Sequence, residues 1–118
     1  MPAHMVVFVT TGSIEEGQNI AQTLVKEHLA ACVNILSRVH SIYRWEGQIQ
    51  NDQETLLIVK TTAELSERLS LRVQQLHSYE VPEIIAVPVV AGAQEYLDWI
   101  DAQTCAQTDA SSTTAEPG

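Results

Sequence analysis

The sequence predicts an α+β fold in which the elements follow the order β-α-β-β-α-β, with a short helix at the end. Two observations lead to this prediction. Apolar residues fill four short β-rich segments, and they recur at helical spacing in the segments between them. The chain has 118 residues, of which 45% are hydrophobic, so we expect one domain with its own core.

The first strand is predicted over residues 6–10, which are β-branched apart from Phe8. Ser13 followed by Glu16 is typical of a capping box, so a helix is expected to begin at Ile14. The apolar residues of this helix recur on one face, which indicates that it packs against a sheet. They are Ile20, Ala21, Leu24 and Val25.

Two strands joined by a hairpin come next. Residues 32–36 and 55–61 are strongly apolar or β-branched, and Gly47 between them is typical of a hairpin turn. Residues 55–59 have almost no polar member, which predicts a central strand covered on both faces. Tyr43 and Trp45 lie at the hairpin tip, where they could form either a contact surface or cross-strand packing within one chain.

A second helix is expected from Thr62 to about His77, because apolar residues form a single stripe along it. A fourth strand over residues 84–90 contains Pro88, which cannot donate to a strand neighbour, so this strand is expected to lie at an edge or to carry a bulge. A short third helix follows over residues 93–103. Residues 104–118 are rich in Ala, Ser, Thr and Gln, so we expect a disordered tail.

This order of elements is the ferredoxin-like, split βαβ arrangement, with four antiparallel strands and two helices on one face. Residues 1–103 would form that domain. Two helices leave the second face of an apolar sheet uncovered. A further copy of the chain is the simplest cover, so the fold is expected to form an oligomer.

Composition excludes several classes of partner. Six Lys and Arg residues stand against fifteen Asp and Glu, a net charge of −9, and the cations are scattered. Nucleic-acid binding and attachment to an anionic membrane both need clustered cations, so neither is expected. No apolar run approaches the roughly 20 residues of a membrane span. Two cysteines make no disulfide framework, which favours a reducing, cytoplasmic location.

The segment from His77 to Glu83 holds the densest group of reactive side chains. Its imidazole, carboxylates and phenol predict a metal or small-ligand site formed by His77, Tyr79, Glu80 and Glu83. The alternative is structural, because His77 would also serve as the end of a helix that Pro82 terminates. Spacing alone leaves both interpretations open.

Two further side chains are candidates for binding. Cys32 could be a soft ligand, although its apolar neighbours favour simple burial. Lys60 ends the central strand and could meet a ligand anion or pair with Glu80 or Glu83. No nucleophile has a base near it in the sequence, so we do not expect an enzyme.

Four segments together resemble the divalent-cation tolerance protein family, CutA. They are Leu29–Ile35 (LAACVNI), Ser41–Gly47 (SIYRWEG), Ile58–Thr61 (IVKT) and His77–Ile84 (HSYEVPEI), with YLDWI at residues 96–100 closing the match. The resemblance covers about residues 5–103. It implies a ferredoxin-like fold of the PII-like type, a cytoplasmic homotrimer assembled through sheet edges and the long hairpin, and a non-catalytic role in metal tolerance, with copper the metal usually named.

The family's copper-associated positions are only partly kept in this chain. Only His77 matches them, because Val9 stands at the first-strand Cys position and Leu76 at that of a second His. Cys32 matches the family's Ala-Ala-Cys segment instead. Ser78 replaces the usual Pro. The expectation is therefore weak binding of copper or another divalent metal at His77 and Glu80. Cys32, Lys60, Tyr79 and Glu83 are expected to contact a small ligand.

A second hypothesis stays open beside the metal-binding one. The resemblance also allows a PII-like signalling module, which would bind a small metabolite in the clefts between subunits and pass its state to an unidentified protein partner.

Overall fold

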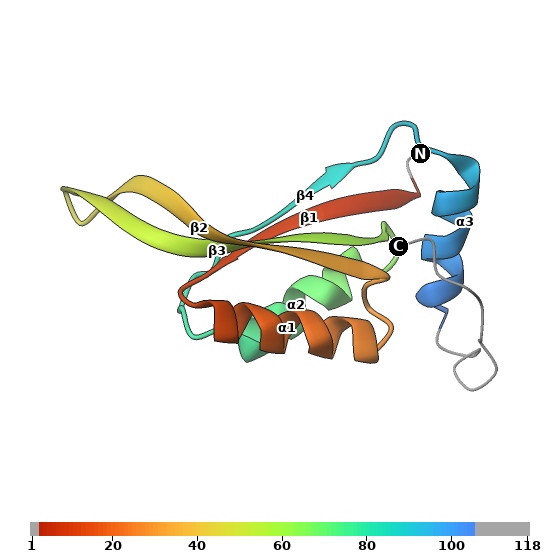
Figure 1. Cartoon of the computed structure of the whole chain (residues 1–118), viewed down its shortest axis with the longest axis horizontal. Helices are drawn as coiled ribbons and strands as arrows, with labels where there is room; N and C mark the ends of the chain where they lie inside the picture. Colours follow the sequence, from red (N-terminus) through yellow and green to blue (C-terminus); the bar gives the residue numbers. More distant parts are fainter. Residues whose placement is uncertain (1–2, 106–118) are drawn as a thin grey trace.

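The computed structural model describes residues 3–105, and its elements follow the predicted order (Figure 1). They are β1 (His4–Thr11), α1 (Ile14–Lys26), β2 (Cys32–Trp45), β3 (Gln48–Thr62), α2 (Ser66–Leu76), β4 (Ile84–Pro88) and α3 (Gln94–Gln103). The predicted α+β class and the start of the first helix at Ile14 are confirmed.

The four strands form one antiparallel sheet in the order β2-β3-β1-β4. Phe8 of β1 lies opposite Ile58 of β3 and Ile85 of β4, which fixes the register at the centre of the sheet. The strand that contains Pro88 lies at an edge, as predicted, because proline has no N–H to give to a further strand. It ends at Pro88 instead of residue 90.

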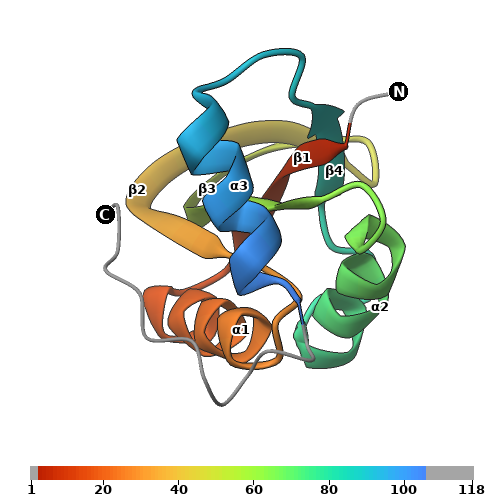
Figure 2. The same ribbon diagram turned by 90° about the vertical axis from the view of Figure 1, so that its right-hand side faces the viewer.

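Helices α1 and α2 lie side by side on one face of the sheet (Figures 1 and 2). Leu57 and Val59 of β3 point into the core between this face and the helices, where both are fully buried. The core comprises Val7, Val9, Ile20, Leu24, Leu29, Ala30, Leu57, Val59, Leu69 and Val73. Burying one such side chain contributes roughly 1.5–3 kcal/mol to folding.

The opposite sheet face is apolar and largely open. Alternate residues of the strands place their side chains here, among them Val6, Phe8, Leu36, Leu56, Ile58, Ile85 and Val87. Leu36, Ile85 and Val87 are exposed, and Leu56 and Ile58 are half-buried. The prediction that β3 is covered on both faces is therefore wrong for the single chain. Helix α3 crosses one end of the sheet (Figure 2).

The β2–β3 hairpin extends beyond the helices and gives the molecule its length of 50 Å (Figure 1). A bulge interrupts the register between Leu36 and Val39, and Arg38 within it has a φ of 64°. At the tip, Glu46 and Gly47 have φ values of 51° and 79°, as a two-residue type I′ turn requires. This outer part of the hairpin, residues 42–49, is called the arm below.

Both ends of α1 are capped. Ser13 Oγ accepts a hydrogen bond from the Glu16 amide at 3.1 Å, which confirms half of the predicted capping box. The Glu16 carboxylate reaches the amide of Gly12 instead of Ser13. At the other end, His28 adopts a φ of 62° and the Leu29 amide donates to the Leu24 carbonyl at 2.9 Å, a Schellman motif.

Two predicted boundaries differ from the structure. Helix α2 begins at Ser66, because Thr62 caps a turn by accepting from the Leu65 amide at 3.3 Å. Thr104, expected in the tail, is buried and donates to the Ile100 carbonyl at 2.9 Å, so it closes α3. The rest of that predicted tail, residues 106–118, lies outside the described residues.

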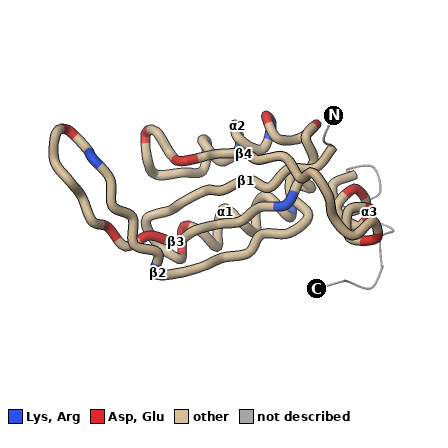
Figure 3. The backbone as a smooth tube through the Cα atoms, turned by 90° about the horizontal axis from the view of Figure 1, so that it is seen from above, with Lys and Arg blue, Asp and Glu red and all other residues tan. Residues whose placement is uncertain are grey.

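Acidic residues are spread along the chain, from the arm to α3, and the few cations are distributed among several elements (Figure 3). This agrees with the scattered cations of the sequence. Within residues 3–105, none of the helices is long and apolar enough to cross a membrane.

Candidate functional site

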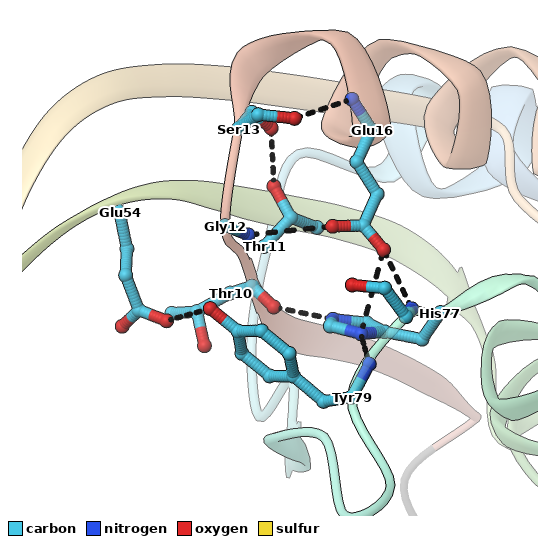
Figure 4. A network of polar contacts seen from close by, with 9 residues as sticks. Thr10, Thr11, Gly12, Ser13, Glu16, Glu54, His77 and Tyr79 are labelled. Carbon is cyan, nitrogen blue, oxygen red and sulfur yellow. Dashed lines mark hydrogen bonds and ion pairs between the residues drawn. The ribbon is translucent and has the colours of Figure 1, made fainter.

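The side chain of His77 lies at the end of α2 and is fully buried against the end of β1 (Figure 4). Its Nε2 lies 2.7 Å from the carbonyl oxygen of Thr10, and its Nδ1 lies 3.1 Å from the backbone nitrogen of Tyr79. A carbonyl can only accept and a backbone N–H can only donate. The imidazole in this arrangement therefore carries its proton on Nε2 and accepts at Nδ1.

Glu16 connects the first turn of α1 to the loop that follows α2. Its Oε2 accepts from the Ser78 amide at 2.7 Å and lies 3.6 Å from His77 Nδ1, while its Oε1 accepts from the Gly12 amide at 3.4 Å. Burial alone would raise the pKa of Glu16. Hydrogen bonds from Ser78 and the Gly12 amide outweigh burial and hold that pKa below its ordinary value of 4.5.

Tyr79 closes this network on the outer side. Its hydroxyl donates to Glu54 Oε2 at 3.0 Å, and its ring centroid lies 4.7 Å from that of His77. Burial and the Glu54 carboxylate raise the pKa of Tyr79 to about 12. A Cβ added at Gly12 would lie 3.1 Å from the Tyr79 hydroxyl, so the small residue makes room for this contact.

The structure brings together only some of the predicted site residues of the loop. His77 and Tyr79 lie in one network. Glu80 and Glu83 follow on the exposed part of the loop, and within residues 3–105 their carboxylates form no hydrogen bond or ion pair. The loop thus offers two solvated carboxylates beside a buried imidazole.

Cys32 and Lys60 lie directly opposite each other on β2 and β3. The Lys60 ammonium donates to the side-chain oxygen of Asn34, so the expected ion pair with Glu80 or Glu83 is wrong. On the same side, burial and the Cys32 thiol raise the pKa of Tyr96 in α3. Cys32 is not part of a disulfide.

The two groups of candidate residues occupy different parts of one chain. Thr10, which holds His77, lies opposite Leu56, and Lys60 is four residues further along β3. Four residues of a strand span about 13 Å. A single chain therefore presents the Cys32–Lys60 pair and the His77 loop as separate places.

Sequence reasoning missed three partners of His77 and Tyr79. The sequence predicts Glu16 only as a helix-capping residue, although its carboxylate also fixes the loop. Glu54 is 25 positions from Tyr79 in the sequence, and the Thr10 contact uses a backbone carbonyl that any residue could supply. Only the capping-box spacing of Glu16 could have drawn attention to this network.

The side chains of the His77–Glu83 loop supply only some of the ligands that a divalent metal ion would need. Carboxylates and imidazole suit such ions, and Glu80 and Glu83 are accessible. Both ring nitrogens of His77 are already hydrogen-bonded. Among the described side chains, no three His, Cys, Asp or Glu gather as a metal site would require.

Residues 5–103 match the family model described as CutA1 divalent ion tolerance protein. A relative in Thermus thermophilus, named divalent-cation tolerance protein CutA, is 52% identical over 84% of this chain and 96% of its own length. Protein CutA, chloroplastic, of Arabidopsis thaliana is 46% identical over 85% of this chain, which spans 55% of the plant protein.

Comparison with solved structures shows that the chain also shares the fold of CutA proteins. The crystal structure of CutA from Xylella fastidiosa superimposes with a TM-score of 0.86 at 39% identity, over 87% of this chain and 99% of that one. The divalent cation tolerance protein of Thermus thermophilus superimposes with a TM-score of 0.81, over 82% and 94%. Sequence and fold together show that the chain belongs to the CutA1 divalent ion tolerance family.

Proposed function

We propose that the chain is a homotrimeric, non-catalytic protein that binds divalent metal ions weakly and contributes to tolerance of them in the cytoplasm, with copper as the favoured metal. The match of residues 5–103 to a family described by divalent ion tolerance carries the proposal. The open apolar sheet face and the protruding arm support assembly, because both leave apolar side chains in water in a single chain.

The proposed metal donors are His77 and Glu80, with Glu83 close in the sequence. For an ion to bind the imidazole, His77 must give up its bond to Thr10 or to the Tyr79 amide. Leaving a buried polar group unpaired costs about 1–3 kcal/mol, which lowers the affinity by about tenfold or more. The remaining ligands would be water or carboxylates of a neighbouring copy.

The proposed cytoplasmic location is supported by the two cysteines, which are not oxidised to a disulfide. Cys32 and Cys105 are not joined in a disulfide, which suits a reducing compartment. Fractionation of the source cells with an antibody to the protein tests this part of the proposal, and recovery outside the cytoplasmic fraction would contradict it.

Titration calorimetry with Cu²⁺ and Zn²⁺ tests the metal proposal. Native protein should bind copper more tightly than zinc, in the usual order of divalent ions. Glu80→Gln should weaken binding, and His77→Ala should abolish it if that variant keeps the native circular dichroism spectrum. Glu67→Gln on the exposed surface of α2 is the matched control and should bind as the native protein does. Equal affinity in native protein and Glu80→Gln would exclude that carboxylate as a ligand.

The PII-like signalling hypothesis is the alternative outcome of the same study. If neither metal produces heat at millimolar concentration, a thermal-shift screen of small metabolites becomes the test. Cys32, Lys60, Tyr79 and Glu83 are the side chains proposed to contact such a ligand. Metabolite binding that Lys60→Gln weakens, without any effect of metal, would favour this alternative.

A further inference from the structure

A cleft lies between the start of α2 and the end of α3, far from the His77 loop. Its volume is about 450 Å³, within the range of roughly 300–1,000 Å³ that small-molecule sites occupy. The residues that line it include Thr62, Glu64, Leu65, Arg68, Asp101 and Thr104. His77 follows the other end of α2, and a helix of this length spans about 16 Å, so the cleft is separate from the candidate metal donors.

Charges of both signs face this cleft without neutralising each other. In the part of the chain that the structure describes, neither Arg68 nor Glu64 forms an ion pair or a side-chain hydrogen bond. Glu64 lies in the turn before α2, and Arg68 lies in the first turn of that helix. The third charge is Asp101, which His4 Nε2 contacts at 2.9 Å.

Hydroxyl groups and one apolar side chain complete the lining. Thr62 Oγ1 accepts from the Leu65 amide at 3.3 Å, so its own hydrogen remains available for a ligand. Thr104 donates to the Ile100 carbonyl at 2.9 Å, so its oxygen can still accept. Leu65 supplies an apolar surface beside these groups.

We propose that this cleft binds a small zwitterion, such as a free α-amino acid with an aliphatic side chain. The guanidinium of Arg68 would receive the ligand carboxylate through paired hydrogen bonds. The Glu64 carboxylate would receive the ammonium group, with Asp101 adding to the negative potential there. Leu65 would contact the aliphatic part of the ligand. A ligand with only one of the two charges would leave one protein charge without a partner.

Leucine and its two single-charge analogues provide the test. Isocaproate lacks the amine and isoamylamine lacks the carboxylate. The full-length protein is titrated with each compound while its amide spectrum is followed by NMR, with a chelator present so that metal binding makes no contribution. Leucine should shift the amides of residues 62–68 and 101–104, and each analogue should bind about tenfold more weakly, because one charged hydrogen-bonding contact is lost.

Substitutions then assign the two charges. Arg68→Gln should weaken leucine and isocaproate about tenfold and leave isoamylamine unchanged, whereas Glu64→Gln should weaken leucine and isoamylamine only. Neither side chain forms an ion pair or a side-chain hydrogen bond within residues 3–105, so both variants should fold. Lys26→Gln at the exposed end of α1 is the charge-matched control and should bind as native protein does.

Three results would overturn the proposal. They are the absence of leucine-induced shifts at millimolar concentration, equal binding of leucine and its analogues, and an affinity for leucine that Arg68→Gln leaves unaltered. Each of these is independent of whether Cu²⁺ binds at the His77 loop, so the two proposals can fail separately.

Discussion

Glu16 holds three parts of the molecule together with one carboxylate. It accepts from the amides of Gly12 and Ser78 and lies beside the imidazole of His77. Glu16→Gln keeps the shape of the side chain but removes its charge. Because hydrogen bonds to a charged group contribute about 1.5–3 kcal/mol each, we expect this variant to lose about that much of its free energy of unfolding at pH 7.

The pH dependence of stability follows from the same residue. The pKa of Glu16 is lower in the folded chain than its ordinary value of 4.5, so its contribution is fully present above that pH and is lost as the pH falls through the folded pKa. Urea unfolding at pH 7 and pH 4 should therefore show a smaller acid-induced loss in Glu16→Gln than in native protein. Glu15→Gln, which changes an exposed neighbour, should behave as native protein does.

All three tyrosines of the chain have a raised pKa. A hydrogen bond to Asp52 raises the pKa of Tyr43, and burial raises those of Tyr79 and Tyr96. A phenol with a raised pKa stabilises the fold below its ordinary value of 10.0, and that stabilisation is lost as the pH rises through the folded pKa. The midpoints of the ultraviolet titration of native protein should therefore lie above pH 10, and Tyr79→Phe should remove the step at about pH 12. A phenolate signal with a midpoint at or below the ordinary value would contradict this.

Among the elements, the tip of the β2–β3 hairpin depends most on one backbone conformation. Gly47 has a φ of 79°, and no atom lies within 4 Å of an added Cβ. A side chain there would therefore cause no steric clash with neighbours but would strain the backbone. Gly47→Ala should cost about 1–2 kcal/mol. Glu46 has a φ of 51°, and Asn tolerates this region better, so Glu46→Asn should raise the melting temperature. Opposite shifts in a thermal melt are the expected result, and shifts of the same sign would contradict the turn assignment.

Elements with a strong local signal were predictable. The Ser13–Glu16 spacing located the start of α1, and Pro88 located the edge strand. Element boundaries that have a weaker sequence signal could not be predicted. His28 adopts the left-handed conformation that glycine would normally supply at the end of α1, so no composition signal marked that position. Thr62 resembles a helix cap but caps a turn, because the helix starts one turn later at Ser66.

The candidate site was predictable only where its chemistry lies within one segment. The stretch from His77 to Glu83 stood out by composition, and His77 and Tyr79 do lie in one network. The tertiary contacts of that network come from the β1–α1 junction and from β3, which no spacing in the sequence connects to the loop. The cleft between the start of α2 and the end of α3 could be predicted least of all, because its lining residues come from separate elements. None of its charged residues stands out in the sequence.

At the scale of the whole molecule, the arm carries large apolar side chains that are exposed in the single chain. Ile42, Ile49 and Trp45 are 69%, 68% and 57% exposed in the single chain. Burying side chains of this size against other copies contributes roughly 1.5–3 kcal/mol each, so we expect the arm to associate with other copies of the chain. Light scattering should give three times the 13.0 kDa of one chain, and the melting temperature should rise with protein concentration.

A double variant of the arm, Ile42→Ser with Trp45→Ser, should lower this mass toward that of one chain, because it removes two large apolar side chains that we expect to be buried on association. Leu71→Ser is the matched control, since Leu71 is 55% exposed on α2, away from the arm, and its loss should leave the mass unchanged. Monomeric native protein at micromolar concentration would contradict the trimer. A trimer that persists in the double variant would instead place the association surface on the open face of the sheet, where Leu36, Ile85 and Val87 are exposed, and would remove the arm from the interface.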